Sequence, residues 1–416
     1  MSTASDSTTS PIESRYAWVR LIAALLLMTV GGAGMYSVMV VLPTLQLEFG
    51  IARADASFPF TATMLGFAAG GLMMGRVADR YGVFGPVVVS AFAQLLGFTL
   101  AAHATSAWQF ALCQGLLIGM LGCSATFAPL LADISHWFSR RRGIAVAICA
   151  SGNYVGGALW PPITQYLVEQ HGWRDAYQTL GILCVVLLLP ISLLIRRPSP
   201  IDHPAPLTAS GHRAPLPPPL AMSPQALMVL LCIAGVACCV AMSMPQVHLV
   251  ALCGDLGFGA AAGAEMLSLM LACGIFSRLA SGYIADRIGG LRTLLIGSTA
   301  QGVALFLFLP ADTLTSLYVV SALFGFFQGG IVPSYAIIIR EYFPAQEAGR
   351  RVGAVVMATL LGMALGGWMS GAIFDWTGNY TAAFLNGIAW NLLNVTIAVF
   401  LLLRLPARGR LAMAQA

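Results

Sequence analysis

The sequence predicts an all-α membrane protein with twelve transmembrane helices arranged in two six-helix bundles. Two features of composition point there: 58% of the 416 residues are hydrophobic and only 9% are charged. Soluble domains carry roughly 25% charged residues, so a soluble chain of this composition could not cover its surface. Lipid removes that requirement, because apolar side chains can face hydrocarbon. The third observation is that apolar runs of membrane-spanning length recur along the whole chain.

Each predicted helix is an apolar run of about 20 residues, the length that crosses the hydrocarbon core of a bilayer. In the first half of the chain these runs are 17–43, 57–75, 84–104, 107–131, 142–167 and 175–195. In the second half they are 225–252, 264–284, 292–309, 314–339, 351–373 and 382–404. The polar segment 196–224 carries nine prolines, so we expect a cytoplasmic linker there. This linker divides the chain into bundles at 17–195 and 225–405, with tails at 1–16 and 406–416.

The positive charges predict how the chain lies in the membrane. The sequence has no lysine, and with the N-terminus inside, all 21 arginines except Arg53, Arg174 and Arg278 fall at cytoplasmic ends or loops. This asymmetry is the positive-inside pattern, and it explains the net charge of +5 without a nucleic-acid partner. The polar N-terminus lacks the pattern of a signal peptide. We therefore expect a monomeric, multi-pass protein of the cell membrane (the inner membrane in a Gram-negative source) with both termini in the cytoplasm.

A short motif occurs twice, once in each half. Residues 75–82 (GRVADRYG) match residues 282–289 (GYIADRIG) at an offset of 207, and each copy lies at the cytoplasmic end of the second helix of its half. This duplicated Gly-x-x-x-Asp-Arg-x-Gly pattern resembles the signature of the major facilitator superfamily. The resemblance covers the whole chain and implies the fold of that family, with substrate carried between two parallel repeats by alternating access. The first copy departs from the family at Val83 and Phe84, where basic residues are usual.

A narrower resemblance is to bacterial members of the monocarboxylate transporter group. It rests on the first helix from Gly34 to Pro43, on residues 137–143 (WFSRRRG) with 151–154 (SGNY), and on residues 275–278 (IFSR). In that group an arginine at the position of Arg278 is implicated in binding the substrate carboxylate. Animal members carry an acidic residue, linked to proton coupling, one turn earlier, and here that position is Gly274. The resemblance implies a monocarboxylate substrate such as lactate or pyruvate.

Arg278 is the strongest candidate for a substrate contact, because it lies inside an apolar run. An arginine at membrane depth costs several kcal/mol unless it meets water, an anion or a partner. One interpretation is a structural pair with a carboxylate, but Asp133, Glu265 and Asp375 all lie near the ends of predicted spans. A substrate carboxylate held by two hydrogen bonds from the guanidinium is therefore the favoured interpretation.

Several other polar residues are candidates for lining the substrate site. His248 could donate to the anion or carry a coupled proton, or it could simply be hydrogen-bonded near the membrane surface. Each of the remaining residues could contact substrate or bond a neighbouring helix instead. They are Asn153, Tyr154, Tyr36, Gln328 and Tyr335.

Four charged residues of the repeated motif are expected to act on conformation instead of binding substrate. Asp79, Arg80, Asp286 and Arg287 lie at the cytoplasmic ends of helices. Charge pairs there could form a conformational latch that holds the halves together in one state and releases them in the other.

The sequence thus predicts a secondary transporter for a small organic anion, with a proton as the coupling ion and the lipid bilayer as its surroundings. The alternative is an exporter of drugs or other hydrophobic compounds by proton antiport, which predicts a carboxylate deep in the membrane. No Walker loop, nucleophile elbow or Cys/His metal spacing is present, so no cofactor, metal or catalytic residue is expected. A sensor would need an output domain, and the longest loop is the proline-rich linker.

Overall fold

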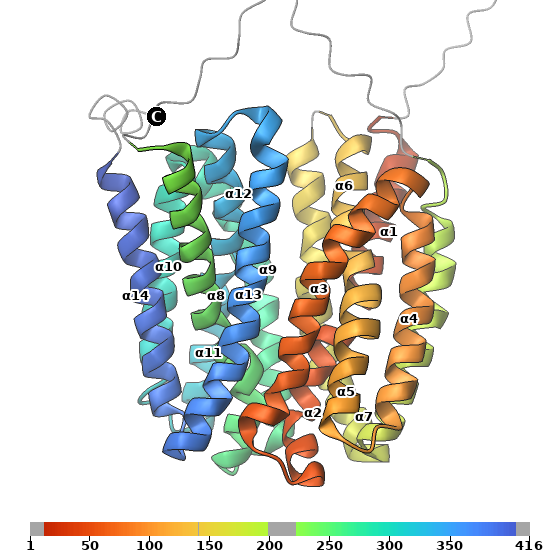
Figure 1. Ribbon diagram of the computed structural model, residues 1–416, viewed down its shortest axis with the longest axis vertical. Helices are drawn as coiled ribbons and strands as arrows, with labels where there is room; N and C mark the ends of the chain where they lie inside the picture. Colours follow the sequence, from red (N-terminus) through yellow and green to blue (C-terminus); the bar gives the residue numbers. More distant parts are fainter. Residues whose placement is uncertain (1–11, 140, 199–221, 405–416) are drawn as a thin grey trace, which may run out of the picture.

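The computed structural model describes residues 12–139, 141–198 and 222–404, and within these ranges the chain is helical without strands (Figure 1). The N-terminal half consists of α1 (Arg15–Gly31), α2 (Ala33–Phe49), α3 (Arg53–Tyr81), α4 (Phe84–Ala102), α5 (Ala107–Leu112), η1 (Cys113–Gly122), η2 (Cys123–Thr126), α6 (Ala128–Trp137) and α7 (Arg142–Leu193). The C-terminal half consists of α8 (Pro224–Asp255), α9 (Gly259–Ile288), α10 (Gly290–Leu307), α11 (Leu314–Gln328), α12 (Ile331–Tyr342), α13 (Ala345–Thr377) and α14 (Thr381–Leu403). The expected tails and linker fall largely outside the described residues.

The number of membrane spans agrees with the predicted fold class. Eleven helical stretches of the described residues are long and apolar enough to cross a membrane. The longest, α7, has 52 residues, more than twice the roughly 20 that one span needs. It leaves helical geometry at Gly172, where φ is 80°, a value that favours glycine. We conclude that α7 contains two spans, and the all-α membrane architecture is confirmed.

Two predicted spans are irregular in the structure. The first is broken into α1 and α2 at Gly32. Beside the break, a Cβ on Gly31 would lie 1.9 Å from the hydroxyl oxygen of Thr126, so glycine is required for this approach. The fourth span contains the π-helix η1, in which Gly119 packs against Thr63 on α3. Hydropathy could not predict the break at Gly32 or the π-helix η1, because both lie inside continuous apolar runs.

The two halves lie side by side, and the described chain begins and ends at the upper end of the view in Figure 1. Contact between the halves runs through α3 with α13, α7 with α9, and α2 with α8. The hydroxyl of Thr61 on α3 donates to the carbonyl oxygen of Ala364 on α13 at 2.9 Å. The hydroxyl of Ser268 on α9 donates to the carbonyl oxygen of Ala158 on α7. Helices of different halves are therefore joined by direct hydrogen bonds as well as by packing.

Candidate functional site

Arg278 lies on α9 at the contact between the two halves. Its Nη1 donates to the carbonyl oxygen of Ala150 on α7 at 3.1 Å, and the side chain is half-buried. Across the parts of the chain that the structure describes, its guanidinium makes no ion pair. A guanidinium has five N–H donors, so this contact leaves most of them available. The arrangement supplies a positive charge with unused donors between the halves.

The ring of Tyr154 on α7 lies against this guanidinium, with 5.0 Å between the Arg278 Cζ atom and the ring centroid. The ring can approach α9 closely because residue 274 is glycine. A Cβ at Gly274 would lie 2.5 Å and 2.7 Å from two ring carbons of Tyr154. The position one turn before Arg278 therefore has no room for an acidic side chain while the ring is in this place.

Tyr36 and Asn153 converge on the same region from α2 and α7. Tyr36 is buried, and it packs so closely on α7 that a Cβ on Gly157 would lie 2.8 Å from two of its ring carbons. A Cβ on Gly32, at the break before α2, would contact the side chains of both Asn153 and Tyr36 at about 3.5 Å. A small cavity with room for about one water molecule borders Asn153. Four of the predicted site residues, Arg278, Tyr154, Tyr36 and Asn153, are therefore brought to one region, where α2, α7 and α9 meet.

Gln328 and Tyr335 are buried among helices of the C-terminal half and bond neighbouring helices. The side-chain Nε2 of Gln246 on α8 donates to Oε1 of Gln328 at 2.8 Å. The hydroxyl of Tyr335 donates to Oδ1 of Asn394 on α14 at 3.0 Å. The structure thus places both residues in the helix–helix contacts that the sequence left open as an alternative.

His248 is fully buried in the last third of α8, in a polar cluster that does not include Arg278. Its Nδ1 is 3.0 Å from the hydroxyl of Tyr380, and its Nε2 is 2.8 Å from the carbonyl oxygen of Gly367. The same hydroxyl accepts from Arg53 of the other half. Sequence analysis placed Arg53 only as an outer arginine, so its contact with the C-terminal half is a finding of the structure.

The four residues of the expected latch are exposed in the last turns of α3 and α9. Arg80 lies over the ring of Tyr81, and Arg287 lies over the ring of Tyr283 in its own helix. Among the described residues, Asp79 and Asp286 form no ion pair with the opposite half. The ion pair that joins the halves is at the lower end, so the latch remains a prediction for another conformation.

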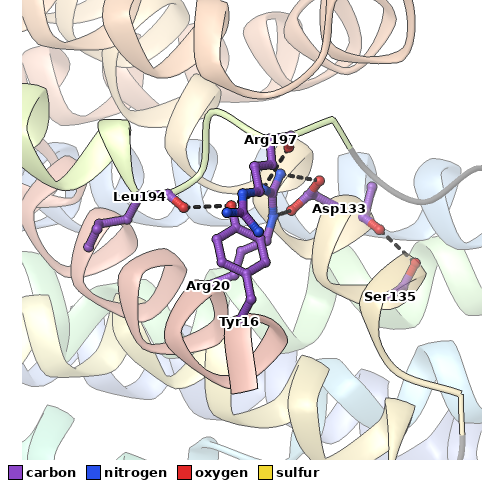
Figure 2. Close-up of polar contacts among 7 residues, drawn as sticks. Tyr16, Arg20, Asp133, Ser135, Leu194 and Arg197 are labelled. Carbon is purple, nitrogen blue, oxygen red and sulfur yellow. Dashed lines mark hydrogen bonds and ion pairs between the residues drawn. The ribbon is translucent and has the colours of Figure 1, made fainter. Parts of the chain in front are cut away.

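A buried ion pair that sequence analysis missed joins α1 to α6 (Figure 2). Arg20 donates from Nε and Nη2 to the two carboxylate oxygens of Asp133 at 2.6 Å and 2.8 Å, and both residues are at most 3% exposed. The Nη1 of Arg20 donates to the carbonyl oxygen of Arg197 at 2.8 Å. The hydroxyl of Tyr16 donates to the carbonyl oxygen of Leu194 at 2.7 Å. The network therefore ties α1 and α6 to the segment that follows α7.

Comparison with known proteins decides the family. The family model described as Major Facilitator Superfamily matches residues 24–316 and 231–414, most of the chain. The chain belongs to the Major Facilitator Superfamily. A solved structure of a bacterial homolog to the human lysosomal transporter Spinster, in an inward-facing and occupied conformation, aligns with a TM-score of 0.64. It covers 94% of this chain and 97% of its own at 16% identity, and therefore supports the fold alone. As a member of this family, the protein is a transporter and not an enzyme.

Relatives of this transporter carry two kinds of name. Monocarboxylate transporter 13 of Rattus norvegicus is 30% identical over 332 residues, which are 79% of this chain and 74% of the relative. The corresponding protein of Bos taurus is 31% identical over 72% of this chain and 70% of its own. The Fujikurins efflux protein of Gibberella fujikuroi is 28% identical over 73% of this chain and 67% of its own. The transporter is thus similar both to named monocarboxylate carriers and to a named efflux protein.

Proposed function

We propose that this transporter moves a small organic anion, a monocarboxylate such as lactate or pyruvate, by alternating access with proton symport. The observation that carries the proposal is the guanidinium of Arg278, which lies between the halves without an ion-pair partner in the described chain. A carboxylate bound there gains charge-assisted hydrogen bonds and satisfies a cation at membrane depth. The similarity to monocarboxylate transporter 13 supports this substrate class.

The residues around Arg278 have distinct proposed roles. Tyr154 holds the guanidinium plane by stacking, as its 5.0 Å approach suggests. Tyr36 and Asn153 supply hydrogen bonds to the remaining polar atoms of a small substrate. Gln328 and Tyr335 act indirectly, because their bonds to Gln246 and Asn394 hold the helices that surround the site.

The direction of the cycle follows from the proposed orientation. We place the arginine-rich upper end in the cytoplasm, in keeping with the positive-inside rule. The halves are then joined on the outside by Arg53 and Asp255. Rocking of the halves opens that side, and the motif residues of α3 and α9 come together on the cytoplasmic side.

The test is uptake of labelled lactate or pyruvate into proteoliposomes, with and without a pH step. Loss of hydrogen bonds to a charged group costs about 1.5–3 kcal/mol, so Arg278→Ala should weaken substrate affinity by roughly 10- to 150-fold. Arg278→Lys keeps the charge but lacks the planar fork, so it should rescue only part of this loss. Arg350→Ala, at an exposed position near the start of α13 and outside the repeated motif, is the matched control and should transport normally.

Two outcomes contradict the proposal at different points. If both variants at position 278 transport like the wild type, the carboxylate does not bind this arginine. If wild-type uptake ignores the proton gradient, transport is not proton symport, although the anion site stands.

The second candidate function is export of hydrophobic compounds by proton antiport. The similarity to the Fujikurins efflux protein favours it. A thermal-shift screen of the purified transporter separates the two functions. Stabilisation by monocarboxylates that disappears in Arg278→Ala supports anion transport, whereas stabilisation only by hydrophobic compounds supports export.

A further inference from the structure

Where α3 begins and α8 ends, one arginine of the N-terminal half is held by three parts of the C-terminal half. Arg53 begins α3, and its Nη1 and Nη2 donate to the two carboxylate oxygens of Asp255, at the end of α8, at 3.0 Å and 3.1 Å. The same Nη1 donates to the hydroxyl of Tyr380, before α14, at 2.7 Å. The guanidinium also lies 4.4 Å from the ring centroid of Phe374 on α13. A side chain that is 7% exposed thus bridges the two halves.

A second carboxylate reinforces this contact through the backbone. Asp375, near the end of α13, accepts from the backbone N–H groups of Arg53 and Ala54 at 2.8 Å each. These N–H groups are the unpaired donors of the first turn of α3, where a negative charge is also favoured by the helix dipole. We call Arg53, Asp255, Asp375, Tyr380 and His248 the Arg53 cluster. Every ion pair and cap in it joins one half of the transporter to the other.

The hydrogen bonds of His248 determine where its proton lies. Its Nε2 faces the carbonyl oxygen of Gly367 at 2.8 Å, and a carbonyl oxygen can only accept, so Nε2 carries the hydrogen. In neutral histidine the other nitrogen, Nδ1, is then an acceptor. The Tyr380 hydroxyl accepts from Arg53 and donates its own proton to Nδ1 at 3.0 Å. A continuous chain of donors runs from Arg53 through Tyr380 to His248.

A second proton on His248 is incompatible with this arrangement. The doubly protonated ring would have a donor on Nδ1, so the Tyr380 hydroxyl would have to accept from Arg53 and His248 together and would lose the acceptor of its own proton. The charged groups that act on the ring are Arg53, Asp255 and Asp375. Both carboxylates already accept hydrogen bonds from Arg53, and His248 is fully buried, so an additional cation there would give up its hydration without a free carboxylate in exchange.

We propose that the Arg53 cluster is the gate at this end of the transporter, and that His248 is a proton-binding site that is occupied only when the gate is open. Opening withdraws Arg53 from Tyr380 and exposes Nδ1, which can then take a proton from solution. With this end facing outside, as the proposed function has it, external acid holds the gate open. One differentially bound proton changes the ratio of open to closed molecules by at most about tenfold per pH unit.

The experiment measures the gate directly, without substrate. Donor and acceptor dyes are attached at Thr105 and Asp312 through non-natural amino acids, which spares the nine native cysteines. Both positions are exposed in lower-end loops, one in each half. Single-molecule distances are recorded in lipid nanodiscs from about pH 8 to about pH 5, the range in which histidine changes charge. The wild type should shift towards the longer distance as pH falls, with a slope of at most about tenfold per unit.

Three variants divide the proposal into its parts. In His248→Gln the amide can donate to Gly367 and accept from Tyr380 without titrating, so the distance should no longer respond to pH. Arg53→Gln and, independently, Asp255→Asn should both favour the longer distance at every pH. His103→Gln is the matched control, because His103 is exposed in the loop that also holds Thr105 and its Nδ1 contacts the carbonyl oxygen of Thr99 in the preceding helix.

A pH response in His248→Gln equal to that of the wild type would overturn the proton site. A short distance in both Arg53→Gln and Asp255→Asn would overturn the gate. Because no substrate is present, these outcomes are independent of anion transport. A transporter that fails to carry lactate but opens with acid refutes only the proposed function.

Discussion

Replacing Gly274 with alanine tests whether close approach of Tyr154 to α9 determines the geometry around Arg278. The added Cβ would lie 2.5 Å from Cε1 of Tyr154, whereas carbon atoms pack at about 3.5 Å or more. The ring must therefore retreat by roughly 1 Å. Such overpacking costs about 1–3 kcal/mol, and it disturbs a cation–π contact worth about 0.5–2 kcal/mol. Alanine also favours the helix over glycine by about 1 kcal/mol, which offsets part of the cost.

These magnitudes predict a change of sign between two backgrounds. With Tyr154 present, Gly274→Ala should lower the thermal unfolding temperature, because the clash exceeds the gain in helix propensity. With Tyr154→Ala, the obstacle is gone, and the same substitution should be neutral or stabilising. Gly353→Ala on α13, where nothing lies within 4 Å of the added atom, should behave alike in both backgrounds.

The measurement is a double-mutant cycle on the purified transporter, followed by titration with lactate. Contacting residues show interaction energies of about 0.5–3 kcal/mol in such cycles. An equal change in both backgrounds would show that residue 274 does not act through Tyr154, and would remove the geometric basis for its role beside Arg278.

Two other contacts give predictions of stability. Asp133→Asn leaves the buried guanidinium of Arg20 without its counter-charge and should cost about 3–5 kcal/mol of unfolding free energy in a denaturation experiment; a change below about 0.5 kcal/mol would contradict this. In Gly66→Ala the new Cβ would lie 1.9 Å from the carbonyl oxygen of Gly115, a backbone atom that cannot swing aside. We expect the substitution to lower the free energy of unfolding by at least the roughly 1–3 kcal/mol that is typical of overpacking. Gly71→Ala on the same helix, where nothing lies within 4 Å of the added atom, should fold normally.

The order and type of the helices could be predicted from the sequence because hydrocarbon imposes one requirement on every span. Apolar length registers that requirement directly. The break at Gly32 could not be predicted in the same way, because glycine differs little from its apolar neighbours in hydropathy. Beside the break, Gly31 closely approaches Thr126, and such an approach is a property of the assembled bundle.

The candidate site was predictable only in part, for a related reason. Arg278 stood out because a charge inside an apolar run is rare. Arg20 and Arg53 did not, because each lies at the edge of a run, where arginines are common. Their importance depends on Asp133 and Asp255, which are 113 and 202 residues away in sequence. A single sequence, taken without its relatives, contains no signal that pairs such distant residues.

The network around Arg20 has a consequence for biogenesis. Asp133 is synthesised 113 residues after Arg20, and Arg197 follows Arg20 by 177 residues. At the usual speed of translation, about 5–20 residues per second, the first helix waits roughly 6–23 s for its counter-ion. During that interval its arginine must stay at the water boundary or in the insertion machinery. Arrival of α6 lets the charge move into the bundle, and the last backbone contact forms only when the sixth span is complete. The ion pair between Arg20 and Asp133 can therefore form only after α6 has been synthesised.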